Sequence, residues 1–203
     1  TMNLKLRYAI DKARAVSMPK YNIERAIKRG TGELEGVTYD EILYEARAAG
    51  GIAILAEVLT DNRNRTAGEI KKIFERANAE VGKPGSAAYL FDRKGFFAID
   101  AAKYPDEDHL MTVALEAGAE DLKREGEVFE ITTDPSNFSA VLDALKASGV
   151  EPAEAEVKYL AKTQQAVDVE TGKKVVKLIE ALDDHDDVQN VVTDAILTEE
   201  MGE

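Results

Sequence analysis

The sequence of 203 residues contains no cysteine, no tryptophan and only two histidines, His109 and His185. Without cysteine the chain forms neither disulfides nor thiolate zinc or iron–sulfur sites, and it has no thiol nucleophile. Two imidazoles leave almost nothing for a histidine metal site. An aromatic content of 6% argues against large stacked-aromatic binding platforms. We therefore expect a protein without a metal or other cofactor.

The chain also lacks an apolar run near the roughly 18 residues that span a membrane, and no apolar run follows a basic start as in a signal peptide. Hydrophobic residues nevertheless make up 44% of the sequence, which is enough for real cores. We expect a soluble intracellular protein of one or two domains, or three small ones, with no membrane partner. Its location would be the cytoplasm, or the mitochondrial matrix if the source is eukaryotic.

Charge is distributed unevenly along the chain. The formal net charge is −13, from 26 Lys and Arg against 39 Asp and Glu. Residues 1–30 contain eight basic and two acidic residues, so this segment carries +6 and the remainder carries −19. A basic arm on an acidic body is typical of a protein whose one end meets nucleic acid, although an ordinary solvated helical face is the alternative. Because the first residues do not resemble a natural start, we expect more chain to precede them.

The basic segment has helical periodicity. Apolar residues from Leu6 to Val16 predict a helix of about three turns, and Pro19 and Gly30 bound a second helix. In the second helix one face carries Ile23, Ala26 and Ile27. At 100° per residue the opposite face carries Tyr21, Arg25, Lys28 and Arg29. We predict a helical hairpin whose basic side lines a nucleic-acid groove.

The period changes after residue 36. Residues 37–47 and 52–59 predict two strands joined at Ala49-Gly50-Gly51, and a helix follows from residue 61. Residues 86–91 and 96–99 predict a second hairpin around Arg93-Lys94-Gly95.

Residues 106–163 predict a helix, two strands, a helix and a strand, which suits a small ferredoxin-like domain. The tail predicts a further helix and a strand at 188–192 that complete the preceding unit. The expected fold class is α+β, with an N-terminal helical hairpin domain and two ferredoxin-like α/β domains, the third inserted in the second. The expected boundaries are 1–32, then 33–105 together with 164–203, and 106–163 as the insertion.

The densest polar cluster is Asp61-Asn62-Arg63-Asn64-Arg65-Thr66, where an apolar strand meets a helix start. Backbone N–H groups at a helix start favour an anion, and two arginines can bind phosphate. The alternative, slightly favoured on physical grounds, is that Asp61 and Asn64 cap turns while the arginines pair with acids such as Glu57 or Glu69.

Other candidate motifs fail on spacing. The acidic run 183–187 lacks the glycine turn and ligand spacing of a calcium loop, so a helix end followed by a polar turn is expected. The segment 82–86 lacks the spacing of a phosphate loop, and Glu41, Glu45 and Glu57 are too scattered for a catalytic pair. No nucleophile motif is present. We expect a protein that is not an enzyme and has no small-molecule substrate.

Several motifs resemble the YebC/PmpR family, which includes the mitochondrial translational activator of cytochrome c oxidase subunit one. They are spread over essentially the whole chain: Ala9–Ala13, Met18–Lys20, Asn22–Gly30, Thr60–Thr66, Gly85-Ser86, Arg93–Gly95, Ala117–Asp121 and Val188–Val191. The resemblance implies a helical first domain and two α/β domains. It also implies either a transcriptional regulator that binds promoter DNA or a ribosome-associated factor that assists translation, without catalytic activity.

The resemblance carries over Lys12, Lys20, Arg25, Lys28, Arg29, Arg63 and Arg65 as residues that contact nucleic acid. The basic face and the polar cluster add Lys5, Tyr21, Asn62 and Asn64 to the candidates. The chain departs from the family in two places: it lacks the family's basic opening with Gly-His-Ser-Lys-Trp, and it has no Gly-Pro turn before Gly50-Gly51.

Three functions remain open at this point. A ribosome- or RNA-associated translation factor is favoured, because shape-driven RNA contact needs only a basic arm. A DNA-binding transcriptional regulator is the alternative, although duplex DNA would repel its acidic body. In addition, the outward face of the second helix offers only Asn22 as a residue that reads adenine. A protein–protein adaptor is the third.

Overall fold

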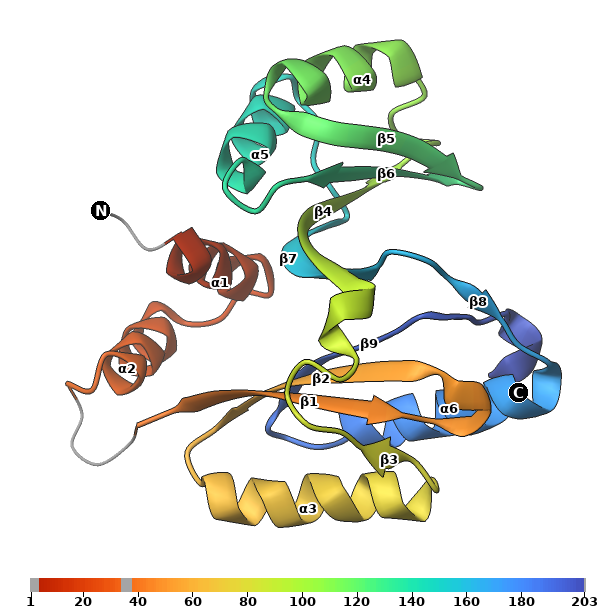
Figure 1. The fold of residues 1–203 in the computed structure, drawn as a ribbon. Coiled ribbons are helices and arrows are strands. Elements are labelled where there is room, and N and C mark those ends of the chain that lie inside the picture. The colour runs from red at the N-terminus through yellow and green to blue at the C-terminus, as the bar shows by residue number, and fades with distance from the viewer. Residues whose placement is uncertain (1–3, 34–37, 203) are drawn as a thin grey trace. The chain divides into compact units, whose positions relative to one another are not determined.

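The computed structural model describes residues 4–33 and 38–202. By its contacts the chain divides into two compact units. We call Thr1–Ala88 with Gln164–Glu203 the larger unit, and Tyr89–Thr163 the inserted unit. The insertion expected from the sequence is therefore present, and Figure 1 shows the elements of both units.

The larger unit begins with the helical hairpin of α1 (Leu4–Ala15) and α2 (Lys20–Gly30). Ser17 has a positive φ of 58° in the turn, and the Met18 N–H donates to the Ala13 carbonyl over 2.9 Å, which closes the end of α1. No residue of α2, which the structure describes throughout, is buried. The predicted hairpin is confirmed, but α2 is not anchored by a core of its own.

Strands β1 (Asp40–Arg47) and β2 (Ala53–Thr60) form the antiparallel hairpin that the sequence predicts. Their turn contains Gly50 and Gly51 with φ of 72° and 76°. Only glycine adopts two such values in succession without strain, which explains how the turn forms without the family's Gly-Pro pair. The predicted strand start at residue 37 lies outside the described residues.

The sheet of the larger unit has the order β3-β1-β2-β9, with β3 at Glu80–Val81 and β9 at Val188–Thr193. Helices α3 (Arg63–Arg76) and α6 (Val169–Asp183) share one core with β2 on one face of this sheet. The core combines Ile54, Ala56 and Val58 with Ile70, Phe74, Val175, Leu178 and Leu182. The chain closes with β8 (Gln165–Ala166) paired to β10 (Ala195–Ile196), and a short turn of helix at Glu199–Met201. The tail thus completes the unit, as expected.

The inserted unit is a β-α-β-β-α-β domain of ferredoxin-like type. Its antiparallel sheet has the order β5-β6-β4-β7. The elements are β4 (Phe91–Asp100), α4 (Glu107–Glu116), β5 (Ala119–Glu125), β6 (Val128–Thr133), α5 (Phe138–Ala147) and β7 (Glu154–Ala161). The larger unit has the same spatial order of strands and helices, with β1 in the place of β6 and β3 in the place of β5. The chain order differs: β6 directly follows β5, whereas β1 comes before all other strands of its sheet.

Two sequence predictions are wrong around β4. The second hairpin at 86–99 does not form, because β4 is one continuous strand, and the insertion therefore begins at residue 89 and not at 106. The misleading signal is Gly95. A Cβ there would lie 2.6 Å from Thr133 Cγ2 and 2.8 Å from a ring carbon of Phe138, whose ring stacks on Phe97 at 4.7 Å. Gly95 makes room for α5 and marks no turn.

Two buried carboxylates hold the segments that enter and leave the inserted unit. Glu45 accepts hydrogen bonds from the N–H groups of Gly85, Ala87 and Ala88 over 2.6, 2.7 and 2.7 Å. Burial alone would raise the pKa of Glu45, but these donors outweigh it and leave the pKa below its ordinary value. Asp194 accepts from the Ala53 N–H over 2.9 Å and from the Gln165 amide over 2.6 Å.

Candidate nucleic-acid interface

The exposed side of α2 carries the basic residues that the sequence singles out. Arg25, Lys28 and Arg29 are exposed, and the side chain of Tyr21 is 70% exposed. Lys20 lies 3.6 Å from Glu24, one turn along the helix, and remains open to solvent. Lys5 and Lys12 belong to α1, but their side chains fall outside the described part of the chain.

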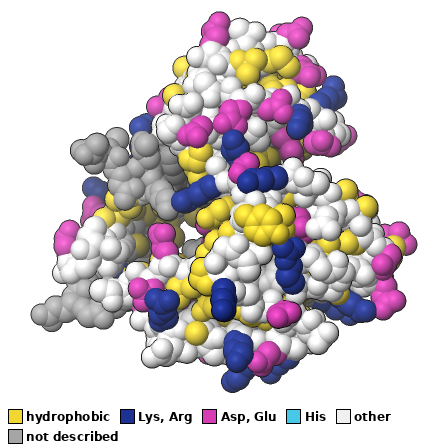
Figure 2. Space-filling model, viewed as in Figure 1, with side chains coloured by type: hydrophobic (Ala, Val, Ile, Leu, Met, Phe, Trp, Pro, Cys, Tyr) yellow, Lys and Arg dark blue, Asp and Glu magenta, His cyan; other side chains and the backbone are white. Residues whose placement is uncertain are grey.

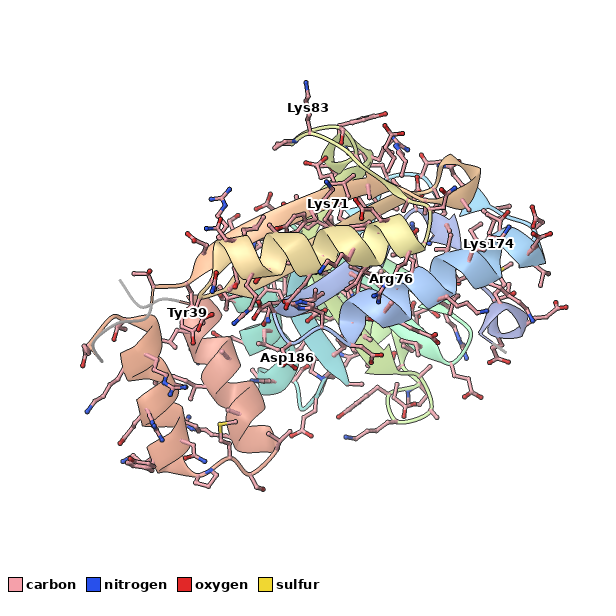
Figure 3. The ribbon with its side chains drawn as sticks, turned by 90° about the horizontal axis from the view of Figure 1, so that it is seen from below. Tyr39, Lys71, Arg76, Lys83, Lys174 and Asp186 are labelled. Atoms are coloured by element: carbon pink, nitrogen blue, oxygen red, sulfur yellow. The ribbon has the colours of Figure 1, made fainter. Side chains whose placement is uncertain are left out.

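A hollow of about 580 Å³ lies between α2 and the neighbouring ends of β1 and β2. Five residues of α2 line it: Asn22, Arg25, Ala26, Arg29 and Gly30. Tyr39, just before β1, and Leu59, near the end of β2, also line it. Figure 3 shows Tyr39 beside the helical hairpin.

This lining corrects the simple division of α2 into a basic and an apolar side. Ala26 shares the hollow with Arg25 and Arg29, whereas Tyr21 and Lys28 do not line it. At 100° per residue, Arg25 and Arg29 lie at the edge of the predicted basic face nearest to Ala26. Arg25 and Arg29 therefore line the hollow, and Lys28 lies outside its lining.

The polar cluster that follows β2 caps helix α3. The Asn62 side chain accepts a hydrogen bond from the Arg65 N–H over 3.1 Å, which is an N-cap contact. The Asn62 N–H donates to the Thr60 hydroxyl over 2.9 Å, and the hydroxyls of Thr60 and Thr66 lie 2.7 Å apart. Thr60 and Thr66 are fully buried. The capping alternative is thus present in the structure, although through Asn62.

Arg65 pairs with acids of the protein itself. Its guanidinium lies 2.8 Å from an Asp187 carboxylate oxygen, with Asp61 at 3.4 Å and Glu69 at 3.8 Å. Burial alone would raise the pKa of Asp187, but hydrogen bonds donated by Thr66, Arg65 and Thr60 outweigh it, so its pKa lies below the ordinary value. The sequence indicates Glu69 as a partner but not Asp187, which lies 122 residues away.

The four cluster residues proposed for nucleic-acid contact therefore differ in their surroundings. Asn62 and Arg65 make contacts within the fold, while Arg63 and Asn64 are exposed in the first turn of α3. A role of any of them in binding stays a prediction.

The acidic run 183–187 follows the end of α6, as expected. Nδ1 of His185 accepts the Asp187 N–H over 3.1 Å, so the proton resides on Nε2, which faces Glu69 at 3.1 Å. Within residues 4–33 and 38–202, no group of three or more His, Asp or Glu side chains is arranged to hold a metal ion. None of the helices in this part of the chain is long and apolar enough to cross a membrane.

Charge differs between the inserted unit and helix α3. The inserted unit has sixteen Asp and Glu against eight Lys and Arg. Helix α3 of the larger unit, in contrast, has five basic and two acidic residues, among them Lys71 and Arg76, which Figure 3 labels. Figure 2 shows Lys and Arg side chains on the near face of the larger unit and many Asp and Glu on the inserted unit.

Two family models match the chain and divide it much as the resemblance implies. The TACO1/YebC protein N-terminal domain matches residues 1–33, and the TACO1/YebC second and third domain matches residues 39–195. The first match coincides with the helical hairpin and the second with the two α/β parts.

Relatives and a solved structure agree with these matches. A probable transcriptional regulatory protein of Clostridium novyi is 49% identical over 98% of this chain and 80% of its own length. One of the same name from Treponema pallidum is 48% identical over 98% of this chain and 81% of its own length. The crystal structure of a conserved hypothetical protein from Aquifex aeolicus matches 97% of this chain and 81% of its own, with a TM-score of 0.87 and 40% identity. The chain therefore belongs to the TACO1/YebC family, as its motifs indicate.

Proposed function

We propose that this chain is a non-enzymatic regulator of gene expression that binds nucleic acid through helix α2. The observation that carries the proposal is the state of α2: none of its residues is buried, and Arg25, Lys28 and Arg29 are all exposed. A helix that has no buried residue and carries this charge is suited to contact with phosphates. The same proposal puts the protein in the cytoplasm, without a cofactor.

Duplex DNA is the first target to consider. The relatives in Clostridium and Treponema are named probable transcriptional regulatory proteins, and this name supports a role in transcription. In that case α2 would neutralise phosphates along a groove, and the acidic inserted unit would have to be held away from the DNA.

RNA or the ribosome is the second target, favoured by the position of Asn22. An asparagine on a recognition helix reads adenine when it projects into the major groove. Asn22 instead lines the hollow together with Tyr39. This arrangement suits contact with an irregular or single-stranded nucleic acid, which is recognised by shape and by unstacked bases, and supports a role in translation.

Binding measurements with charge-reversed protein test the proposal. Promoter-length duplex DNA and purified ribosomes are titrated in parallel across a salt series. The variant is Arg25→Glu/Lys28→Glu/Arg29→Glu, and the matched control is Lys71→Glu/Lys72→Glu/Arg76→Glu on α3. We expect the α2 variant to lose affinity and salt dependence for the true target, with a smaller loss for the α3 variant.

The outcome also separates the targets. Tight, sequence-dependent DNA binding without ribosome association favours transcription, and salt-sensitive ribosome binding far tighter than DNA binding favours translation. If the α2 variant binds both as wild type does, the proposal is wrong. A protein–protein adaptor that keeps its partners would then explain the family better.

A further inference from the structure

The hollow beside α2 combines charged, polar, aromatic and apolar groups. Arg25 and Arg29 bring two positive charges, and Asn22 brings an amide that both donates and accepts hydrogen bonds. Tyr39, 43% exposed, brings an aromatic ring, while Ala26 and Leu59 bring apolar surface. Its volume of about 580 Å³ falls in the range of small-molecule binding sites.

These groups match the parts of one nucleotide. Guanidinium groups bind phosphate with two parallel hydrogen bonds. An aromatic ring stacks on a base of any sequence, and an amide side chain reads a base edge. A base that is paired within a duplex is covered by its neighbours on both faces and cannot reach a concave site unless it is extruded.

We propose that this hollow binds one unstacked nucleotide of the nucleic acid that α2 contacts. Arg25 and Arg29 hold its phosphate, Tyr39 stacks on its base, and Asn22 hydrogen-bonds the base edge. The inference rests on the proposed function and adds to it a preference for unpaired nucleotides. The nucleotide comes from single-stranded RNA or from a locally melted DNA strand, and the arms of the test distinguish the two.

The chain offers a matched pair of tyrosines for the test. Tyr39 lines the hollow, whereas Tyr21, also exposed, is carried by α2 and does not line it. The affinity of Tyr39→Ala, Tyr39→Phe and Tyr21→Ala is measured by fluorescence anisotropy. The probes are a 12-nucleotide RNA without secondary structure, the same sequence as single-stranded DNA, and its DNA duplex. Circular dichroism verifies that each variant is folded.

We expect Tyr39→Ala to weaken binding of the single strands about tenfold, as loss of one base–aromatic stack does. Tyr39→Phe keeps the ring and stays near wild type, and Tyr21→Ala changes little. The duplex is insensitive to Tyr39→Ala. A stronger effect on RNA than on single-stranded DNA identifies RNA as the source, and the reverse identifies a melted DNA strand.

A second readout locates the base directly. With 4-thiouridine in the RNA, irradiation should cross-link the peptide that contains Tyr39. Equal losses for Tyr39→Ala and Tyr21→Ala, or cross-links confined to the Tyr21 and Lys28 side of α2, overturn the inference while the charge-reversal result leaves the proposed function standing. If the charge-reversed α2 variant also binds all probes normally, both fail together.

Discussion

Helices α2 and α3 are both basic, yet the structure uses their charges differently. Helix α3 buries Thr66, Ile70 and Phe74, and its Arg65 pairs with Asp187. Helix α2 has no fully buried residue, and its Arg25 and Arg29 line a hollow. The lesson is that a run of Lys and Arg does not define a binding surface by itself. What the opposite side of the helix packs against decides whether the charge stabilises the fold or faces a ligand.

The largest expected difference between the two helices concerns stability. Phe74→Ala removes a fully buried ring from α3, and we expect the free energy of unfolding to fall by about 3–5 kcal/mol. Ile27→Ala on α2 removes a half-buried side chain and should lower it by less than about 1.5 kcal/mol. Urea denaturation followed by circular dichroism measures both. Equal losses would mean that α2 is anchored as firmly as α3.

A smaller effect is expected at the start of α3. Thr66→Val keeps the shape of the side chain but removes the hydroxyl that contacts Thr60 and donates to Asp187. Leaving buried polar partners unsatisfied should lower the free energy of unfolding by about 1–3 kcal/mol. Thr112→Val is the control, because Thr112 is exposed on α4, and it should change stability by less than about 0.5 kcal/mol. Similar losses for the two variants would mean that the hydrogen bonds of Thr66 do not stabilise the fold.

Acid should weaken the hydrogen bonds that Glu45 and Asp187 accept. The pKa values of Asp187 and Glu45 lie below those of the unfolded chain, so the unfolded state binds more protons as the pH falls. The resulting stability is fully present above the unfolded values of 3.8 and 4.5, and it is lost as the pH falls through the lower folded values. Denaturation of wild type and Asp187→Asn at pH 7 to 3 measures this. The variant should be less stable at neutral pH and lose less in acid; parallel curves would contradict the prediction.

The smallest expected change separates two arginines in binding. Arg25→Ala should reduce the slope of log affinity against log salt by about 1, the value for one lost phosphate contact. Arg65→Ala should leave the slope unchanged, because the Arg65 guanidinium already forms an ion pair with Asp187. Titration of the preferred nucleic acid at four salt concentrations decides between them. A slope reduced by Arg65→Ala and not by Arg25→Ala would reverse the roles assigned to the two helices.

Local periodicity was enough to predict the helical hairpin and the first strand pair, because both depend on short-range patterns. The prediction failed at β4, where Asp92-Arg93-Lys94-Gly95 has the composition of a turn. Gly95 is there because a side chain at this position would collide with Phe138, a residue far away in the sequence. It also missed the carboxylates of Glu45 and Asp187, whose partners lie 40 to 122 residues away. The hollow was missed for the same reason, since Tyr39 and Leu59 come from other elements than α2.

The carboxylates of Glu45 and Asp194 have a mechanical consequence. Glu45 anchors the outgoing segment as far as Ala88, and Asp194 anchors the returning one at Gln165. Inside the inserted unit the two segments are joined where the Lys162 N–H donates to the Leu90 carbonyl over 2.9 Å. Only Tyr89 separates Ala88 from Leu90, and only Thr163 and Gln164 separate Lys162 from Gln165. The two anchors therefore limit each connection between the units to a span of one or two residues.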